Sequence, residues 1–190
     1  AVVVPLAGAV EAEVAAGGTV RPVERLAEVV AALRGEEAWP THPIEPPAAP
    51  VGVAPDLADV HGQPLARHAL ELAAAGGHHT LFVGPPGAGK TMLASRLPGL
   101  LPDLDRNQAL EATMIPAGGL VTRPPFRSPH HTSSRVALVG GGSRTLRPGE
   151  ISLAHRGVLF MDEFAEFAPT VLDGLRQPLE ERAVRIVRSE

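Results

Sequence analysis

The sequence predicts an α/β fold in which short apolar strands alternate with helices. Thr80–Val83 is predicted to form a buried strand, and a glycine-rich loop and a helix follow it. Gly157–Met161 is predicted to form a second buried strand, which ends in two acids. Apolar runs of roughly four to eight residues bounded by turn residues are typical of strands in parallel sheets. We therefore expect a parallel sheet flanked by helices.

The composition is that of a globular chain. The 190 residues are 44% hydrophobic, contain no cysteine and carry a formal net charge of −4. The lack of cysteine excludes disulfide frameworks and thiol nucleophiles, and the acidic balance excludes a chain that binds nucleic acid over its whole surface. No apolar run approaches the roughly 18 residues of a membrane span, and no signal-peptide pattern is present. We expect a cytoplasmic protein with no membrane partner.

Residues 1–38 are expected to form a small α/β piece, and a linker follows it. Residues 39–55 contain six prolines, which favours an extended, solvated segment and a domain boundary. Residues 56–190 would then form the main domain. In the first piece we expect strands at Val2–Val4 and Thr19–Val23, and helices at Ala9–Ala16 and Arg25–Leu33, the last one ended by Gly35.

Further elements of the main domain follow from start and stop signals. Pro at a first helical position, Asp as an N-cap and Gly or Pro after the last turn mark the ends of helices. We expect helices at Pro64–Ala75, Lys90 to about Leu97 with Pro98 as the stop, Asp105–Thr113 and Pro169–Leu179, and a strand at Val184–Val187.

Residues 84–91 match the phosphate-binding pattern G-x-x-x-x-G-K-[ST] at every fixed position, between a predicted strand and a predicted helix. Glycines allow positive φ and let backbone N–H groups close around a phosphate. Lys90, the only lysine of the chain, would bind the β- and γ-phosphates as a catalytic residue, and Thr91 would offer a hydroxyl to Mg²⁺. The predicted nucleotide contacts are Gly84, Pro85, Pro86, Gly87, Ala88, Gly89, Lys90, Thr91 and Met92.

The acid pair after the second apolar run completes this chemistry. Ligands collect at the carboxyl ends of parallel strands, so Asp162 is expected to hold Mg²⁺, largely through water. Glu163 is expected to deprotonate an attacking water as the general base. A kinase does not need this second carboxylate, whereas a hydrolase does. The sequence therefore favours an ATPase that uses Mg²⁺.

Residues 112–149 form a cationic segment with five arginines and no acid. Such a flexible, basic segment is suited to a nucleic-acid backbone, and Arg123, Arg127 and Arg135 are the predicted DNA contacts. A loop that faces a neighbouring subunit is the alternative. The adjacent His130 and His131 lack a third ligand at a sensible spacing, which argues against a metal site.

Three stretches resemble one family. Arg123 to Thr132 (RPPFRSPHHT), Pro148 to Gly157 (PGEISLAHRG) and Leu175 to Glu181 (LRQPLEE) are similar to motifs of the magnesium-chelatase-like AAA+ ATPases. Residues 1–38 resemble the end of the Lon-protease-like domain that precedes the ATPase in the YifB/ComM branch. The resemblance covers nearly the whole chain. One departure is Arg182, which stands where the group often has glycine, so we expect an altered turn after Glu181.

The resemblance implies an AAA+ fold and a hexameric, ATP-driven ring. It places Val60, His61 and Gly62 against adenine, and it implies a helicase that remodels DNA by branch migration. It also implies that the lid, sensor and trans-acting arginine of the ring lie outside this chain. We therefore expect a fragment that is monomeric and nearly inactive by itself.

Two other functions stay open. A chelatase-type motor subunit would drive metal insertion through protein partners, although chelatase motor subunits generally lack a Lon-like domain. An ATP-dependent scaffold would bind nucleotide and signal by conformation, although such a protein has no use for Glu163.

Overall fold

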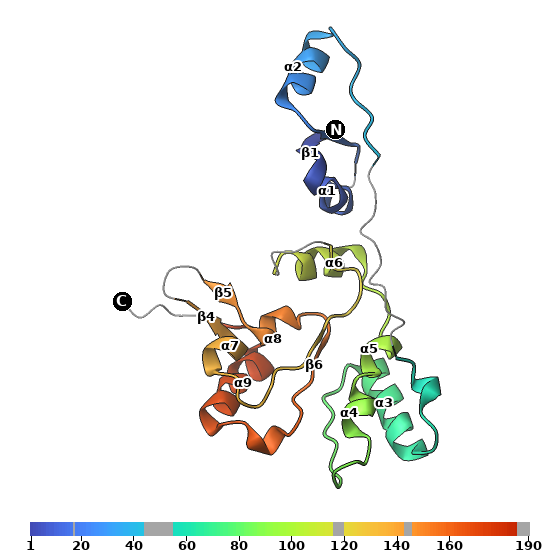
Figure 1. Ribbon diagram of the computed structural model, residues 1–190, viewed down its shortest axis with the longest axis vertical. Coiled ribbons are helices and arrows are strands. Elements are labelled where there is room, and N and C mark those ends of the chain that lie inside the picture. Colours follow the sequence, from blue (N-terminus) through green and yellow to red (C-terminus); the bar gives the residue numbers. More distant parts are fainter. Residues whose placement is uncertain (17, 44–54, 116–119, 143–145, 186–190) are drawn as a thin grey trace. The chain divides into compact units, whose positions relative to one another are not determined.

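The computed structural model describes residues 1–16, 18–43, 55–115, 120–142 and 146–185 (Figure 1). Its contacts divide the chain into two units. Unit 1 is Ala1–Val51 with Asp105–Val121, and unit 2 is Gly52–Leu104 with Thr122–Glu190. Residues 44–54 of the predicted linker lie outside the described residues, and the predicted domain limits stay a prediction.

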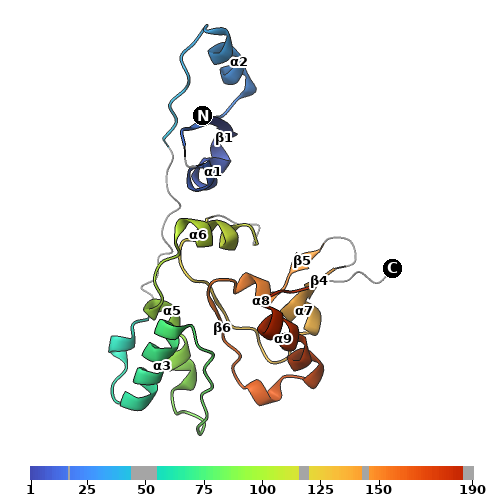
Figure 2. The ribbon, with the colours of Figure 1, turned by 180° about the vertical axis from the view of Figure 1, so that it is seen from behind.

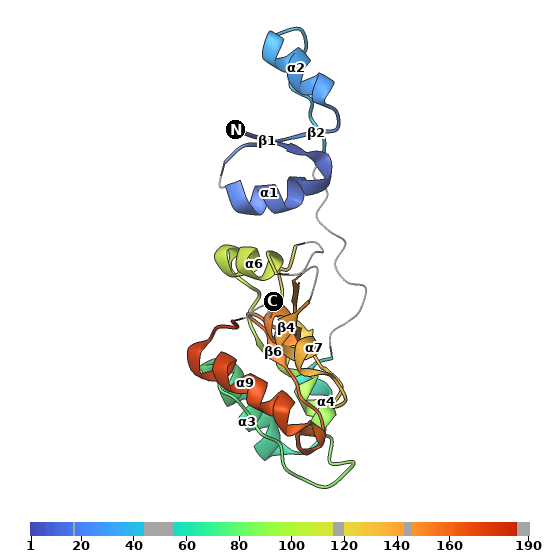
Figure 3. The same ribbon diagram turned by 90° about the vertical axis from the view of Figure 1, so that its left-hand side faces the viewer.

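Unit 1 contains a β-α-β element. Strands β1 (Val2–Pro5) and β2 (Val20–Val23) pair in parallel. Helix α1 (Ala9–Ala16), preceded by the 3₁₀ turn η1 (Leu6–Gly8), connects the two strands and packs against them (Figure 3). Parallel neighbours require such a crossover, because a tight hairpin cannot join them. The two strands and the helix predicted here are confirmed.

The two other helices of unit 1 lie within one residue of their predicted bounds. Helix α2 (Leu26–Arg34) ends at Gly35, whose φ of 72° is a left-handed conformation that glycine adopts without strain. Helix α6 (Arg106–Thr113) begins after Asp105, whose carboxylate accepts a hydrogen bond of 2.9 Å from the Gln108 N–H. Helix α6 packs on α1.

Three helices of unit 2 surround a first hydrophobic cluster, and they lie together in Figure 2. They are α3 (Pro64–Gly76), α4 (Lys90–Ala94) and α5 (Leu97–Leu100), with the 3₁₀ turn η2 (Leu57–Asp59) beside them. The buried members of this cluster are Leu57, Val60, Leu70 and Leu93. Burying one side chain of this kind stabilises the folded state by about 1.5–3 kcal/mol.

The remaining elements of unit 2 enclose a second hydrophobic cluster, made of Leu138, Phe167, Val171 and Leu175. Strands β3 and β6 pair in parallel, and β4 and β5 pair antiparallel. In chain order these elements are β3 (Phe126–Arg127), α7 (Arg135–Val139), β4 (Gly140–Gly141), β5 (Arg147–Pro148), α8 (Glu150–Leu153), β6 (Val158–Leu159), the 3₁₀ turn η3 (Phe164–Glu166) and α9 (Pro169–Glu181).

The close pairing of β3 and β6 depends on Gly157. A Cβ on this residue would stand 2.1 Å from the Pro125 carbonyl oxygen, closer than any side chain can approach. The same carbonyl accepts a hydrogen bond of 2.8 Å from the Val158 N–H. The residue before β6 therefore has to be glycine for the strand that leads to the acid pair to reach its neighbour.

The prediction of a buried strand at Thr80–Val83 is wrong. The segment has no regular secondary structure and belongs to no described sheet, and Leu81 and Val83 are 74% and 88% exposed. A strand needs a hydrogen-bonded neighbour, and among the described residues β3 and β6 pair with each other instead. Of the four residues in this segment, Phe82 is the one that packs against the first cluster. Among the residues of unit 2 that the structure describes, the predicted parallel sheet is present only as the β3–β6 pair.

Two further predictions are corrected. The helix expected from Lys90 to about Leu97 ends at Ala94, because a proline at position 98 of a continuous helix would clash with the Ala94 carbonyl. Pro98 itself lies in the first turn of α5, so it begins the next helix as well as limiting this one. Residues 184–185 form no strand, and residues 186–187 lie outside the described residues. Within the described part of the chain, no helix is long and apolar enough for a bilayer.

Candidate nucleotide-binding site

The glycine-rich loop has the backbone that its sequence predicts. Gly87 and Gly89 have φ of 77° and 80°, the left-handed region in which side chains are strained. The chain turns at Pro86 and Gly87, and the Ala88 N–H donates a hydrogen bond of 3.3 Å to the Pro85 carbonyl. The loop then enters α4 at Lys90. These residues fit a loop that closes around a phosphate.

Lys90 folds back over this loop. Its ammonium donates hydrogen bonds of 2.9 Å to the Gly84 carbonyl and 3.0 Å to the Pro85 carbonyl. These acceptors are neutral, whereas hydrogen bonds to an ionised phosphate are roughly twice as strong. Lys90 therefore lies where it can exchange the two carbonyls for phosphate oxygens.

The structure brings the two predicted Mg²⁺ residues into contact. The Thr91 hydroxyl donates a hydrogen bond of 2.7 Å to Oδ2 of Asp162, across 71 positions of sequence. Hydroxyl and carboxylate oxygens are the hard donors that Mg²⁺ prefers, with water and phosphate completing its shell. No group of three or more His, Cys, Asp or Glu side chains among the described residues could hold a metal by itself. The pair thus fits an ion that is shared with a nucleotide.

Glu163 follows in a strained conformation. Its φ and ψ are 52° and 48°, and its N–H donates a hydrogen bond of 3.0 Å to Oδ1 of Asp162. A non-glycine residue in this region costs about 1–3 kcal/mol, and such strain concentrates at functional sites. The carboxylate is 64% exposed and lies 3.2 Å from Nδ1 of His131.

The three residues predicted to contact adenine differ in their exposure to solvent. The Val60 side chain is only 1% exposed and belongs to the first cluster, while His61 and Gly62 are exposed. Any contact from Val60 to a nucleobase would have to come from its backbone. The adenine contact of these three residues stays a prediction.

Gln63 was missed by the sequence reasoning. Its side-chain amide donates a hydrogen bond of 3.0 Å to the Ala88 carbonyl, so the turn after the adenine segment is tied to the phosphate loop. Met92, the last predicted nucleotide contact, lies close to the same loop, with its Cε 3.1 Å from where a Cβ on Gly89 would stand. The sequence signal that could have identified Gln63 as a site residue was its position between the predicted adenine contacts and α3.

Each of the three predicted DNA contacts lies close to another part of the protein: two pair with an acid, and the third lies beside a helix. Arg127 makes a bidentate pair with Glu150, with Nε–Oε2 and Nη2–Oε1 distances of 2.6 and 2.8 Å. This hydrogen bonding holds the pKa of the Glu150 carboxyl below its usual range. Arg123 lies 3.5 Å from Asp103, and both are well exposed. The cationic segment contains no acid, but acids outside it neutralise part of its charge.

Arg135 has a different environment. It is the first residue of α7 and is exposed, and its side chain lies along α9, within 3.6 Å of where a Cβ on Gly174 would stand. Of the two other arginines of the segment, Arg147 is exposed and Arg144 lies outside the described residues. The exposed Arg123 and Arg135 are therefore better placed than Arg127 to reach a phosphate backbone.

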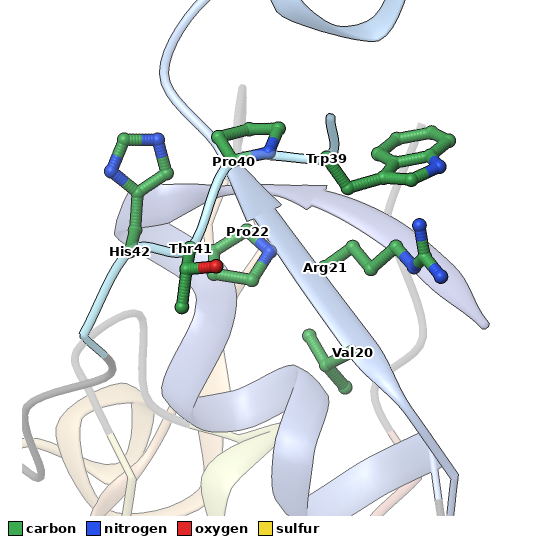
Figure 4. Close-up of a pocket in the computed structure, with 7 residues that line it drawn as sticks. All are labelled: Val20, Arg21, Pro22, Trp39, Pro40, Thr41 and His42. Carbon is green, nitrogen blue, oxygen red and sulfur yellow. The ribbon is translucent and has the colours of Figure 1, made fainter. Parts of the chain in front are cut away.

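A pocket also occurs in unit 1. It encloses about 380 Å³ and is formed by β2 and residues 39–42. Figure 4 shows Arg21 beside Trp39, with the guanidinium carbon 4.6 Å from the ring centroid. The pocket shares no residue with the phosphate loop or the acid pair.

Comparison with known proteins matches these motifs to one family. The family described as "Magnesium chelatase, subunit ChlI" matches residues 56–190. An uncharacterized protein of Mycobacterium tuberculosis is 49% identical over 198 aligned positions, which cover 100% of this chain and 39% of that protein. The uncharacterized protein YifB of Escherichia coli is 52% identical over 143 positions, 70% of this chain and 28% of its own. The competence protein ComM of Haemophilus influenzae gives the same identity and coverage. The chain thus spans about two fifths of the length of the mycobacterial relative.

Proposed function

This chain belongs to the family of magnesium chelatase subunit ChlI, in its YifB/ComM branch, and from that premise we propose that it is the ATP-binding and ATP-hydrolysing part of an AAA+ motor. The observation that carries the proposal is the hydrogen bond between Thr91 and Asp162, which joins the phosphate loop to the acid pair. ATP is the proposed substrate and Mg²⁺ the proposed cofactor.

Each residue has a distinct part in the proposed reaction. Lys90 would balance the charge of the β- and γ-phosphates. Thr91 and Asp162 would hold Mg²⁺, which would supply positive charge to stabilise the negative charge on those phosphates. Glu163 orients a water and accepts its proton as the water oxygen attacks the γ-phosphorus. The leaving group is ADP.

Two other functions, a chelatase-type motor and a nucleotide-dependent scaffold, are the alternatives to this proposal. The family description favours a chelatase-type motor that drives metal insertion. Two relatives that match 70% of the chain carry the names YifB and ComM and favour the first proposal. A nucleotide-dependent scaffold is tested by phosphate release from the full-length protein with ATP and Mg²⁺. A protein that binds ATP and releases no phosphate would support the scaffold.

We further propose that ATP hydrolysis by a hexameric ring of the full-length protein drives DNA remodelling, with the cationic segment as the DNA surface. The support is its five arginines in a chain of net charge −4 and the resemblance to a branch that includes a competence protein. If about four phosphates are neutralised on a single strand, the salt slope is roughly −3, so affinity falls about 50-fold between about 50 and 200 mM salt.

The arginines should separate into two classes. Arg123→Gln combined with Arg135→Gln should flatten the salt slope by about 1 to 1.5 and weaken all sequences alike, because phosphate contacts carry no base information. Arg127→Gln should instead lower the free energy of unfolding by about 1–2 kcal/mol, because Glu150 loses its partner. DNA titrations and denaturant unfolding measure the two effects.

A broken ring would also lose DNA binding, so the ring has to be measured in the same variants. Sedimentation with ATP reports whether Arg123→Gln with Arg135→Gln still assembles. Intact rings with weakened DNA binding support the DNA surface. Rings that dissociate, or DNA binding that is unchanged, would end this part of the proposal.

A further inference from the structure

We propose that His131 is a positioning residue for Glu163, which it holds in the orientation that a general base requires. The inference rests on the proposed function, because it assumes that Glu163 accepts the proton of the attacking water. The sequence argued against a metal site at His131 and gave this residue no part in the reaction, whereas the structure places it in contact with Glu163.

The pairing of β3 with β6 brings the two residues together. These strands are parallel, with Arg127 opposite Leu159. His131 lies four residues after Arg127, and Glu163 lies four residues after Leu159. The two segments therefore leave the same edge of the strand pair at equal distances along the sequence. Nδ1 of His131 then lies 3.2 Å from Oε2 of Glu163.

His131 is the anchored partner of this contact. Its side chain is 29% exposed, against 64% for Glu163. The edge of its ring meets the ring of Phe167 at a centroid distance of 6.5 Å and an angle of 81°, and Phe167 is 2% exposed in the second cluster. On another side the His130 ring lies 4.1 Å away, centroid to centroid. Packing thus restrains the imidazole, whereas the Glu163 side chain is mostly exposed and, among the described residues, its carboxylate pairs with His131.

An exposed carboxylate needs such a restraint to act as a base. A general base works only within hydrogen-bonding distance of the proton that it removes, and an exposed glutamate side chain populates several rotamers. In many hydrolytic sites a third group orients the base. A carboxylate only accepts hydrogen bonds, so His131 would donate through an N–H at Nδ1. One oxygen of Glu163 is then held while the other is left for water.

The test uses variants that separate the ring from its donor. His131→Phe keeps the aromatic contact with Phe167 but has no N–H, and His131→Gln keeps a donor of similar reach. His130→Phe is the matched control, since the nearest polar group to His130 is the Thr132 hydroxyl at 2.9 Å and not Glu163. The variants are made in the full-length protein. The measurements are kcat and KM for ATP, the affinity for ATP, and the unfolding midpoint.

The expected result is a kcat about 10-fold lower in His131→Phe, smaller than the effect of losing the base itself, which is worth about 10²–10⁴. ATP affinity and the unfolding midpoint should stay unchanged, His131→Gln should recover most of the rate, and His130→Phe should match wild type. A normal kcat in His131→Phe, or a kcat lost together with ATP affinity or stability, would overturn the inference. Glu163→Gln in parallel tests the proposed function separately, since an unaffected rate there removes the base itself.

Discussion

Glu163→Gln in the full-length protein should lower ATP hydrolysis by roughly 10² or more while ATP still binds. The amide keeps the size of the side chain but cannot accept the proton of the attacking water. The affinity is expected to persist because the residues proposed to hold the phosphates and Mg²⁺ are Lys90, Thr91 and Asp162, which this variant leaves unchanged. Phosphate release at saturating ATP, with the affinity measured on the same preparation, tests this expectation.

The matched control is Glu166→Gln. Glu166 is an exposed carboxylate three residues away, in η3, and it has no proposed part in the reaction. Glu166→Gln removes the same negative charge as Glu163→Gln. Because Glu166 has no part in the proposed reaction, hydrolysis in this variant should stay at the wild-type rate. Equal hydrolysis by wild type and Glu163→Gln would remove Glu163 from the reaction and leave the acid pair without its proposed base.

Lys90→Ala should weaken ATP binding about 10- to 100-fold, since one charge-assisted hydrogen bond contributes about 1.5–3 kcal/mol. The change also leaves the Gly84 and Pro85 carbonyls without their donor. Titration with a fluorescent ATP analogue in the presence of Mg²⁺ measures the loss. ADP should be affected less than ATP, because it lacks the γ-phosphate that Lys90 is expected to bind.

Lys90→Arg distinguishes charge from shape at this position. Arginine keeps the positive charge but presents a rigid planar fork in place of a compact ammonium. The two carbonyls that now accept from Nζ are adjacent in the chain and close around a single point. We expect weakened binding in this variant as well, and wild-type affinity in both variants would show that Lys90 is not a phosphate contact.

Local signals in the sequence predicted local structure well. Asp105 caps α6 and Gly35 ends α2, because each signal acts on residues within one turn. Pro98 was misjudged, since the same residue that stops one helix can begin another. Arg182 adopts φ 54° at the end of α9, a left-handed conformation that glycine adopts without strain, so arginine stands here in a turn that favours glycine.

Contacts between distant residues could not be predicted in the same way. The partner of Arg127 is Glu150, 23 positions away, and nothing near Arg127 in the sequence identifies it. His131 meets Glu163 only because β3 and β6 pair in one register. The strand predicted at Thr80–Val83 failed for a related reason, since apolar composition does not supply a neighbouring strand. The motifs indicate candidate residues for the chemistry, and the pairing of strands determines which of these residues meet.

The central claim is that the phosphate loop and the acid pair form one Mg²⁺–ATP site, and a double-mutant cycle tests it most directly. The measurement is the Mg²⁺-dependent part of ATP affinity in the full-length protein, for wild type, Thr91→Val, Asp162→Asn and the double variant. If both residues hold the same ion, the double variant should lose little more than the worse single variant, with a coupling of roughly 1–2 kcal/mol. Losses that simply multiply would contradict the account and assign the two motifs to separate sites.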